Sequence, residues 1–213
     1  TFDIEQITVY DSARRVACDS YSGVLQQPDV ARWNDAWGRL DDPDHANFRW
    51  LTIGQLGYMG TGEWTVEAWV RLDNVDPYHK MYLWYQEAPG ENVAAYLYAF
   101  KELTTNNYLE FRHSVSSSYR FRYRFDIGEI DLGVWHHVAL VRIGMDMQFY
   151  VDGVSKSQYD TIPFTEGTAF IDLESPAKLA MRHNGTYMDE WRYSSFARYT
   201  ENFTPPTGPF VLD

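Results

Sequence analysis

Arginine recurs at every second position in one short stretch of the chain, at Arg120, Arg122 and Arg124. Because successive side chains of a β-strand point to opposite faces, this spacing would place the three guanidinium groups on one face, about 7 Å between neighbours. Guanidinium groups bind carboxylate and sulfate through paired hydrogen bonds, and they stack on aromatic rings. The chemistry that the row indicates is therefore the binding of anions.

A possible acidic partner for this row lies a few residues upstream. If residues 114–118 turn the chain back on itself, Arg112 would lie opposite Arg120 and Glu110 opposite Arg122. Four arginines would then share a patch with one acid. Two interpretations stay open: a ladder of ion pairs completed by carboxylates of a third strand, or a contact face for an acidic glycan or a negatively charged protein surface.

The other residues with ligand chemistry give weaker signals. Cys18 is the one cysteine, which excludes an internal disulfide and any cysteine-based cluster. His136 and His137 are adjacent, so in a strand they would point to opposite faces and could not chelate one metal together. Two acidic loops could offer oxygen ligands to calcium, but neither has the spacing of a known motif, and solvated turns are the favoured interpretation. The carboxylates of these loops are Asp41, Asp42, Asp44, Asp73 and Asp76.

The overall charge excludes several classes of partner. The chain has 18 basic and 30 acidic residues, a formal net charge of −12. A protein with this balance lacks the basic surface that phosphate backbones require, so we expect no nucleic-acid partner. No apolar run approaches the roughly 18 residues of a membrane helix, and the first residues lack the basic and apolar segments of a secretory signal. We therefore expect no membrane insertion.

Aromatic and β-branched residues alternate with polar ones along much of the chain, at the period of strands. The pattern predicts strands at 64–72, 119–126 and 135–143. A tight connection at 144–146 leads to a hairpin partner that begins at 147 and alternates up to a turn at 152–153. Many strands with short connections and no long helix favour an all-β, antiparallel two-sheet sandwich. Further strands are predicted at 80–87, 93–101, 107–113, 168–173, 177–182 and 186–194.

The alternation also predicts the core and the extent of the domain. Residues 1–47 are less regular, with one short helix expected at 28–35. No repeat, low-complexity tract or linker divides the chain, so we expect a single domain over residues 1–213. The side chains expected in the core are Trp64, Val66, Ala68, Val70, Phe121, Tyr123, Trp135, Val138, Leu140, Phe149 and Val151.

Three motifs in sequence order resemble those of one known family. The run GTGEWTVEAWV at 60–70 resembles the Gly-x-Gly-x-Phe-Thr-Ile-Glu-Ala-Trp-Val strand of concanavalin A-like, laminin-G-like jelly-roll domains. WHHVALVR at 135–142, followed by FYVDG at 149–153, is similar to that family's Trp-His-His-Val-Ala-x-x-Arg hairpin. MDEWRYS at 188–194 resembles its closing Asp-Glu-x-Arg-x-Ser strand. The resemblance implies a two-sheet jelly-roll sandwich of the concanavalin A type.

Polysaccharide-cleaving enzymes share that fold, so their chemistry needs a direct test. Retaining glycosidases place two carboxyl groups about 5 Å apart. Glu129-Ile130-Asp131 begins like the Glu-x-Asp-x-x-Glu pattern of laminarinase-like members, but Leu132-Gly133-Val134 follow and the second Glu is missing. The chain also lacks the Gly-x-Ser-x-Gly, Walker and His-Glu-x-x-His motifs. We therefore expect no catalytic residues and no cofactor; a polysaccharide hydrolase or lyase is the less favoured alternative.

The run ARYTENFTPP at 197–206 resembles a tail found in domains of bacteriophage virion proteins. This resemblance implies a non-catalytic structural and binding protein of the virion surface, such as a capsid decoration or a tail or fibre component, made in the host cytoplasm. The extended segment 199–213 suits packing along a neighbour, so the expected partners are other virion proteins or copies of the chain. An acidic surface polysaccharide is the second partner considered, and a free-standing lectin-like module is the alternative function.

Overall fold

In the computed structural model, the described residues are 62–73, 79–88, 91–99, 107–115, 118–163, 178–181 and 186–210, together with six short strands that precede them. All regular structure in these residues is β-strand, as the alternation predicts. None of the described elements is a helix of the length and apolarity that a membrane span requires. The helix predicted at 28–35 and the strand predicted at 168–173 lie outside the described residues.

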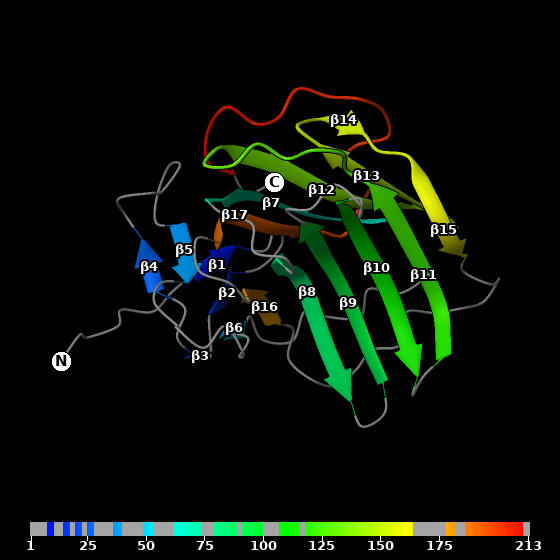
Figure 1. Cartoon of the computed structure of the whole chain (residues 1–213), viewed down its shortest axis with the longest axis horizontal. Helices are drawn as coiled ribbons and strands as arrows, with labels where there is room; N and C mark the ends of the chain where they lie inside the picture. Colours follow the sequence, from blue (N-terminus) through cyan, green and yellow to red (C-terminus); the bar gives the residue numbers. More distant parts are fainter. Residues whose placement is uncertain are drawn as a thin grey trace.

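Two antiparallel sheets form the layers of a sandwich (Figure 1). The eight-stranded sheet has the order β15-β11-β10-β9-β8-β16-β6-β3, and the seven-stranded sheet the order β14-β13-β12-β7-β17-β5-β4. The first sheet comprises β3 (Ser20–Ser22), β6 (Arg49–Thr52), β8 (His79–Ala88), β9 (Glu91–Ala99), β10 (Tyr108–Val115), β11 (Ser118–Asp126), β15 (Gln158–Ile162) and β16 (Lys178–Met181). The second comprises β4 (Leu25–Gln27), β5 (Ala36–Arg39), β7 (Trp64–Leu72), β12 (Trp135–Ile143), β13 (Asp146–Val151), β14 (Val154–Ser155) and β17 (Thr186–Ser194). A separate pair joins β1 (Thr8–Tyr10) to β2 (Arg15–Ala17).

The core lies between the two sheets and consists of the apolar half of each alternating strand. Trp64 is enclosed by Trp84 and by Phe111, whose ring meets it edge-on at 5.5 Å. The predicted core residues are buried with one correction: Trp135 is only half-buried, because it begins β12 at the margin of the sheet. The side-chain alternation therefore identifies the core correctly except at a strand end.

The predicted hairpin of β12 and β13 is confirmed, as is the turn that follows it. Val151 pairs with Val154, which leaves Asp152 and Gly153 as a two-residue loop. Both loop residues have positive φ, 50° and 76°, as a type I′ turn requires. The turn carries β14 back along the edge of the sheet.

The outer face of the seven-stranded sheet is covered by residues 195–210 of the same chain, here called the C-terminal strap, which crosses the top of the molecule in Figure 1. Thr65 anchors its beginning: the Thr65 hydroxyl donates to the Phe196 carbonyl and accepts from the Arg198 amide, both at 3.0 Å. Farther along, Tyr199 and Phe203 stack on each other at 3.5 Å. The sequence predicts packing along a neighbouring subunit, whereas the described part of the tail packs on its own sheet.

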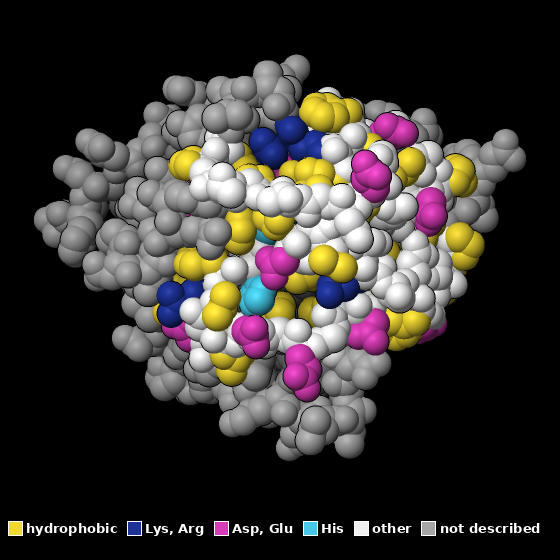
Figure 2. Space-filling model, turned by 90° about the horizontal axis from the view of Figure 1, so that it is seen from above, with side chains coloured by type: hydrophobic (Ala, Val, Ile, Leu, Met, Phe, Trp, Pro, Cys, Tyr) yellow, Lys and Arg dark blue, Asp and Glu magenta, His cyan; other side chains and the backbone are white. Residues whose placement is uncertain are grey.

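The strap also makes backbone contacts with the turn between β13 and β14. The Phe203 amide donates to the Gly153 carbonyl at 3.0 Å, and the Asn202 side chain accepts from the Ser155 amide at 2.9 Å. A Cβ atom at Gly153 would lie 1.8 Å from the Phe203 carbonyl oxygen. Glycine is therefore required here both by the turn and by the close approach of the strap. Among the described residues, this side of the molecule mixes hydrophobic and charged side chains (Figure 2).

Candidate functional site

The outer face of the eight-stranded sheet carries most of the predicted arginine row. In the pairing of β10 with β11, Arg112 lies opposite Arg122 and Glu110 lies opposite Arg124. Their neighbours in each strand, such as Phe111, point into the core, so alternation directs these four polar side chains outward. The strands β10 and β11, near the β15 edge of this sheet, therefore place three guanidinium groups around one carboxylate.

The predicted pairing of Arg112 with Arg120, and of Glu110 with Arg122, is wrong. The turn lies later in the chain than that pairing assumes, and the register shifts once near it, which makes Arg120 the extra residue of a β-bulge. A bulge interrupts the alternation, so Tyr119 joins the arginines on the outer face. The Arg112 guanidinium donates to the Tyr119 hydroxyl at 3.5 Å, and that of Arg122 lies 4.7 Å from the ring centre.

Two carboxylates hold the three arginines in a ladder. Glu110 is fully buried and accepts from Arg124 Nε at 2.5 Å and from Arg112 at 3.1 Å. Asp160, on the edge strand β15, accepts from Arg122 at 2.6 Å and from Arg124 at 2.7 Å. This is the ladder completed by a third strand that the sequence left open. It does not remove the arginines from the surface, since their side chains keep 16–25% of their exposure.

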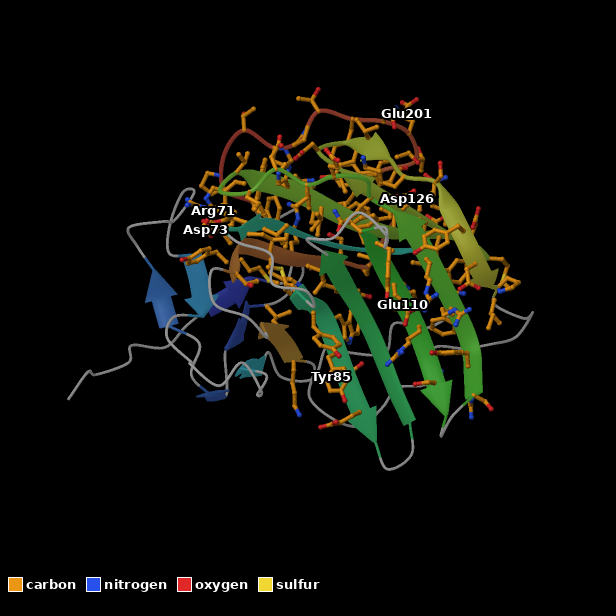
Figure 3. The ribbon with its side chains drawn as sticks, viewed as in Figure 1. Arg71, Asp73, Tyr85, Glu110, Asp126 and Glu201 are labelled. Carbon is orange, nitrogen blue, oxygen red and sulfur yellow. The ribbon has the colours of Figure 1, made fainter. Side chains whose placement is uncertain are left out.

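Tyrosine rings surround the guanidinium groups. The Arg124 guanidinium lies 5.2 Å from the centre of the Tyr108 ring, and Tyr159 meets Tyr108 edge-on at 6.4 Å. On β8, Tyr85 lies in register with Arg112 across β9 (Figure 3). We call this surface the arginine face; its described side chains are Tyr82, Tyr85, Glu87, Tyr108, Glu110, Arg112, Tyr119, Arg122, Arg124, Tyr159 and Asp160.

The electrostatics of the arginine face fix its protonation states. Burial by itself lowers the pKa of Arg124, but the hydrogen bond and charge of Glu110, with the charge of Asp160, outweigh it and raise that pKa. Burial also raises the pKa of Tyr85, and the neighbouring carboxylate of Glu87 raises it further. The guanidinium therefore stays cationic and the phenol neutral at ordinary pH. The face offers fixed cations, phenolic hydroxyls and flat rings, which suit a polar ligand with ring faces.

The structure gives no support to the weak metal candidates that it describes. Asp73 accepts from Arg71 Nε at 2.6 Å, so its carboxylate is engaged by a cation. Asp41, Asp42, Asp44 and Asp76 lie outside the described residues. Among the side chains that are described, no three His, Cys, Asp or Glu residues lie close enough to hold a metal ion.

The two adjacent histidines have separate environments, as their alternation predicts. His136 Nδ1 lies 2.7 Å from an Asp152 carboxylate oxygen, and its Nε2 lies 3.2 Å from the Asp131 carbonyl oxygen. His137 is fully buried on the outer face of the seven-stranded sheet, with Nε2 3.0 Å from Glu67. Glu129 and Asp131, the start of the glycosidase-like pattern, are exposed in the irregular connection between β11 and β12.

A second polar cluster, which the sequence reasoning missed, lies under the C-terminal strap. Glu67 is completely buried on β7 and receives hydrogen bonds from His137 at 3.0 Å and from Arg192 Nε at 2.8 Å. From the strap, the Tyr199 hydroxyl donates to Glu67 at 2.9 Å, and Arg198 forms an ion pair at 3.4 Å. Each partner comes from the sheet or from the strap on top of it. The cluster therefore joins these two layers and offers no open surface for a ligand.

The sequence signals differ in strength for the residues that were missed. Asp160 lies in 158–162, where the alternation is too weak to predict a strand, and its side chain meets arginines 36 and 38 positions earlier. Tyr119 lies on the outer face because of a bulge in the strand pairing, and the regular alternation of residue types in the sequence does not indicate that bulge. Glu67 alternates with core residues in a predicted strand, so the sequence places this acid on the face that points away from the core. Its burial could not be predicted, because the strap covers that face.

Comparison with known structures supports the fold. Domain 4 of AbnA, an extracellular GH43 arabinanase from Geobacillus stearothermophilus solved with arabinotriose, has 17% identity and a TM-score of 0.53, covering 83% of this chain and 77% of that one. The binding domain of Paraclostridial Mosquitocidal Protein 1 has 13% identity and a TM-score of 0.54, covering 91% and 49%. Botulinum neurotoxin type C, whose cell entry is described as dependent upon interaction with two ganglioside molecules, has 12% identity and a TM-score of 0.55, covering 90% and 48%.

At these identities the likeness shows the fold alone, and the chain spans about half the length of the two toxin chains. A search of curated protein sequences gives no match. The family model described as "Concanavalin A-like lectin/glucanases superfamily" matches residues 45–192, which include most strands of both sheets. With its antiparallel, two-layered, lectin-like jelly-roll architecture, the chain belongs to the concanavalin A-like lectin/glucanase superfamily.

Proposed function

We propose that the protein is a non-catalytic carbohydrate-binding module that contacts glycans through the arginine face. The observation that carries this proposal is the joint presentation of guanidinium groups and tyrosine rings by adjacent strands, with Arg122 over Tyr119 and Arg124 over Tyr108. Sugars combine hydroxyl edges with apolar ring faces, and such a surface offers donors for the first and rings for the second. Two similar structures support the proposal: domain 4 of AbnA was solved in complex with arabinotriose, and cell entry of botulinum neurotoxin type C is described as dependent upon interaction with two ganglioside molecules.

The geometry favours binding over cleavage. Both oxygens of Glu110 are engaged by arginines, and so are both oxygens of Asp160, so neither carboxylate is placed as a free nucleophile or general acid. Glu129 lies in the exposed connection between β11 and β12, outside the strands that carry the arginines. Assay of reducing ends released from plant, algal and bacterial polysaccharides should give only background. Release that disappears in the Glu129→Gln variant would overturn the non-catalytic assignment.

The setting that we propose is the surface of a bacteriophage particle, with other virion proteins as neighbours. Its support is the resemblance of residues 197–206 to the tail of virion-protein domains. Mass spectrometry of purified particles is the test, and detection of the chain in them is the expected result. A monomer absent from every particle, but retained on a sugar column, would favour the free-standing lectin-like module.

The glycan proposal is tested with the double variant Arg122→Ala/Arg124→Ala on a glycan array. Binding should fall at least tenfold, because losing a desolvated guanidinium contact costs about 2–5 kcal/mol, whereas an exposed pair is worth about 0.2–1 kcal/mol. Arg71→Ala is the matched control, since Arg71 forms a comparable surface pair with Asp73 on the other sheet. Should the double variant lose thermal stability and still bind normally, the arginine ladder is scaffolding and the proposed site is wrong.

A further inference from the structure

Glu110 and Asp160, which both form ion pairs with arginines of the arginine face, are held very differently. Glu110 lies on β10, inside the sheet, and is fully buried between Arg112 and Arg124. Asp160 lies on β15, the edge strand, and its side chain keeps 45% of its exposure. Exposed ion pairs contribute only about 0–1 kcal/mol, because water competes for both partners. The Asp160 carboxylate is therefore readily exchanged for another anion, whereas the Glu110 carboxylate is a fixed part of the sheet.

The backbone at Asp160 has an irregularity that aims this carboxylate at the arginines. The pairing of β15 with β11 shifts register between Arg122 and Arg124, so two residues of β15 face one residue of β11. Asp160 sits in this bulge with a positive φ of 48°, a conformation that Asp and Asn adopt more readily than other side chains with a Cβ. One carboxylate oxygen then reaches Arg122 and the other reaches Arg124.

The position between these two guanidinium groups is a seat for a carboxylate. Arg122 and Arg124 each approach one oxygen of the same carboxylate, at 2.6 and 2.7 Å, while Tyr119 and Tyr108 support their guanidinium planes. Among the described residues, Asp160 is the one carboxylate paired with Arg122. Without Asp160, Arg122 would lose this ion pair, while Arg124 would keep its pair with Glu110. An anion of the same shape could take the place of the Asp160 carboxylate.

Building on the proposed function, we infer that Asp160 is an internal stand-in for a ligand carboxylate, and that the arginine face selects glycans bearing uronic acids. A uronic-acid carboxylate displaces Asp160 and bridges Arg122 and Arg124, while the sugar ring lies against the neighbouring tyrosines. Asp160 thereby sets the selectivity of the face. It competes weakly with uronic acids, and it leaves no unpaired cations when the face is empty.

The test is Asp160→Asn, which removes the charge and keeps a side chain that tolerates positive φ. Asp126→Asn is the matched control. It removes the same charge from the end of β11, where Asp126 lies (Figure 3) and its carboxylate accepts from the Gly128 amide at 2.9 Å. Binding of polygalacturonate should rise roughly three- to tenfold in the Asp160 variant and stay unchanged in the control, while binding of uncharged dextran stays unchanged in both.

Several outcomes would overturn the inference while leaving the proposed function intact. One is glycan binding by the wild type with no gain for polygalacturonate in Asp160→Asn beyond that of Asp126→Asn. Another is a preference of the variant for dextran sulfate, which would make the seat one for sulfate. If Asp160→Asn fails to fold, Asp160→Gly takes its place, since glycine also suits the positive φ. Failure of both would make Asp160 a structural fixture and end the inference.

The two proposals also fail separately. If the wild type and Asp160→Asn bind no glycan at all, the proposed function is wrong. Carboxylate binding between Arg122 and Arg124 can then be tested separately, by measuring how much sodium glucuronate raises the unfolding temperature of each variant. Stabilisation of Asp160→Asn above that of Asp126→Asn would retain the seat as a property of the fold. Equal stabilisation of the two variants would reject it.

Discussion

Glu67 is a buried carboxylate that joins the seven-stranded sheet to the C-terminal strap. Burial alone raises the pKa of this carboxyl, but the hydrogen bond from His137 and the charges of Arg192 and His137 outweigh burial and hold the pKa below its ordinary value. The ionised form is therefore the one that the fold stabilises. Because it connects two layers, its loss should affect the whole domain.

Replacing Glu67 by Gln should lower the free energy of unfolding by about 3–5 kcal/mol, because the buried Arg192 would lose its ion pair with Glu67. Urea denaturation followed by tryptophan fluorescence measures the change. Glu87→Gln is the control, since Glu87 pairs with Lys178 at the surface and its loss should cost about 0–1 kcal/mol. Equal losses in the two variants would mean that the Glu67 cluster contributes nothing beyond a surface pair.

Two groups give the stability of the domain opposite pH dependences. The lowered pKa of Glu67 means that its contribution is present above the unfolded-state pKa, near 4.5, and is lost as pH falls through the folded pKa. The hydrogen bond and charge of Asp152 raise the pKa of His136 against the effect of burial. The contribution of His136 is therefore complete below about pH 6.5 and is lost as pH rises through the raised pKa.

The stability lost in His136→Gln should accordingly be larger at pH 5.5 than at pH 9. Chemical denaturation of the wild type and the variant at both pH values gives the comparison. In Asp152→Asn the residual pH dependence of His136 should be reduced, because the carboxylate that faces its Nδ1 is gone. A His136→Gln effect of the same size at both pH values would contradict this assignment.

At the scale of elements, the turn between β13 and β14 provides a direct test of strap docking. Gly153→Ala forces a Cβ into the Phe203 carbonyl, 1.8 Å away, and strains a residue with φ of 76°. Gly144→Ala is the matched control, because its φ of 59° brings similar strain while nothing lies within 4 Å of the added carbon. Gly144→Ala should lower the free energy of unfolding by about 1 kcal/mol.

Gly153→Ala should lose clearly more free energy of unfolding than the control. It should also become more sensitive to trypsin at Arg198, a strap residue that is half-buried while the strap is docked. Limited proteolysis and thermal unfolding report the two effects. Equal stability losses in the two alanine variants, with no new cleavage, would show that the strap is not held at this turn.

The strands show how far the sequence leads. The sequence predicts the bounds of β7, β12 and β17, although both faces of these strands are largely buried and β17 shifts register between Asp189 and Arg192. It predicts which arginines share a face but misplaces Arg120, since the bulge that removes it depends on the hydrogen bonding between two strands. The alternation cannot place Asp160 either, because the edge strand β15 has little burial to impose a pattern. The pattern of residue types therefore does not predict long-range contacts at irregular backbone positions.

At the scale of the whole molecule, the family match ends before the domain does. The match covers residues 45–192, yet the Glu67 cluster and the apolar cluster of Ala139, Val141 and Tyr150 both include strap residues. The cooperative unit should therefore extend to residue 210. Deleting the strap and everything after it, residues 195–213, should give an aggregating protein without a sharp unfolding transition. A soluble, cooperatively unfolding product of this deletion, measured by calorimetry, would contradict this.

The position of the strap in the chain also determines when the fold can be completed during synthesis. Glu67 is translated 132 residues before Tyr199, which donates to it in the finished protein. At about 5–20 residues per second, the ribosome needs roughly 7 to 26 s to cover that distance. Until the strap is made, the outer side chains of the growing sheet have no cover from it: Trp69 for most of this time, and Val141 and Tyr150 for the shorter time that remains after they are translated. A chaperone that binds apolar segments should meet this chain while it is still attached to the ribosome, and should lose its binding site when the strap docks.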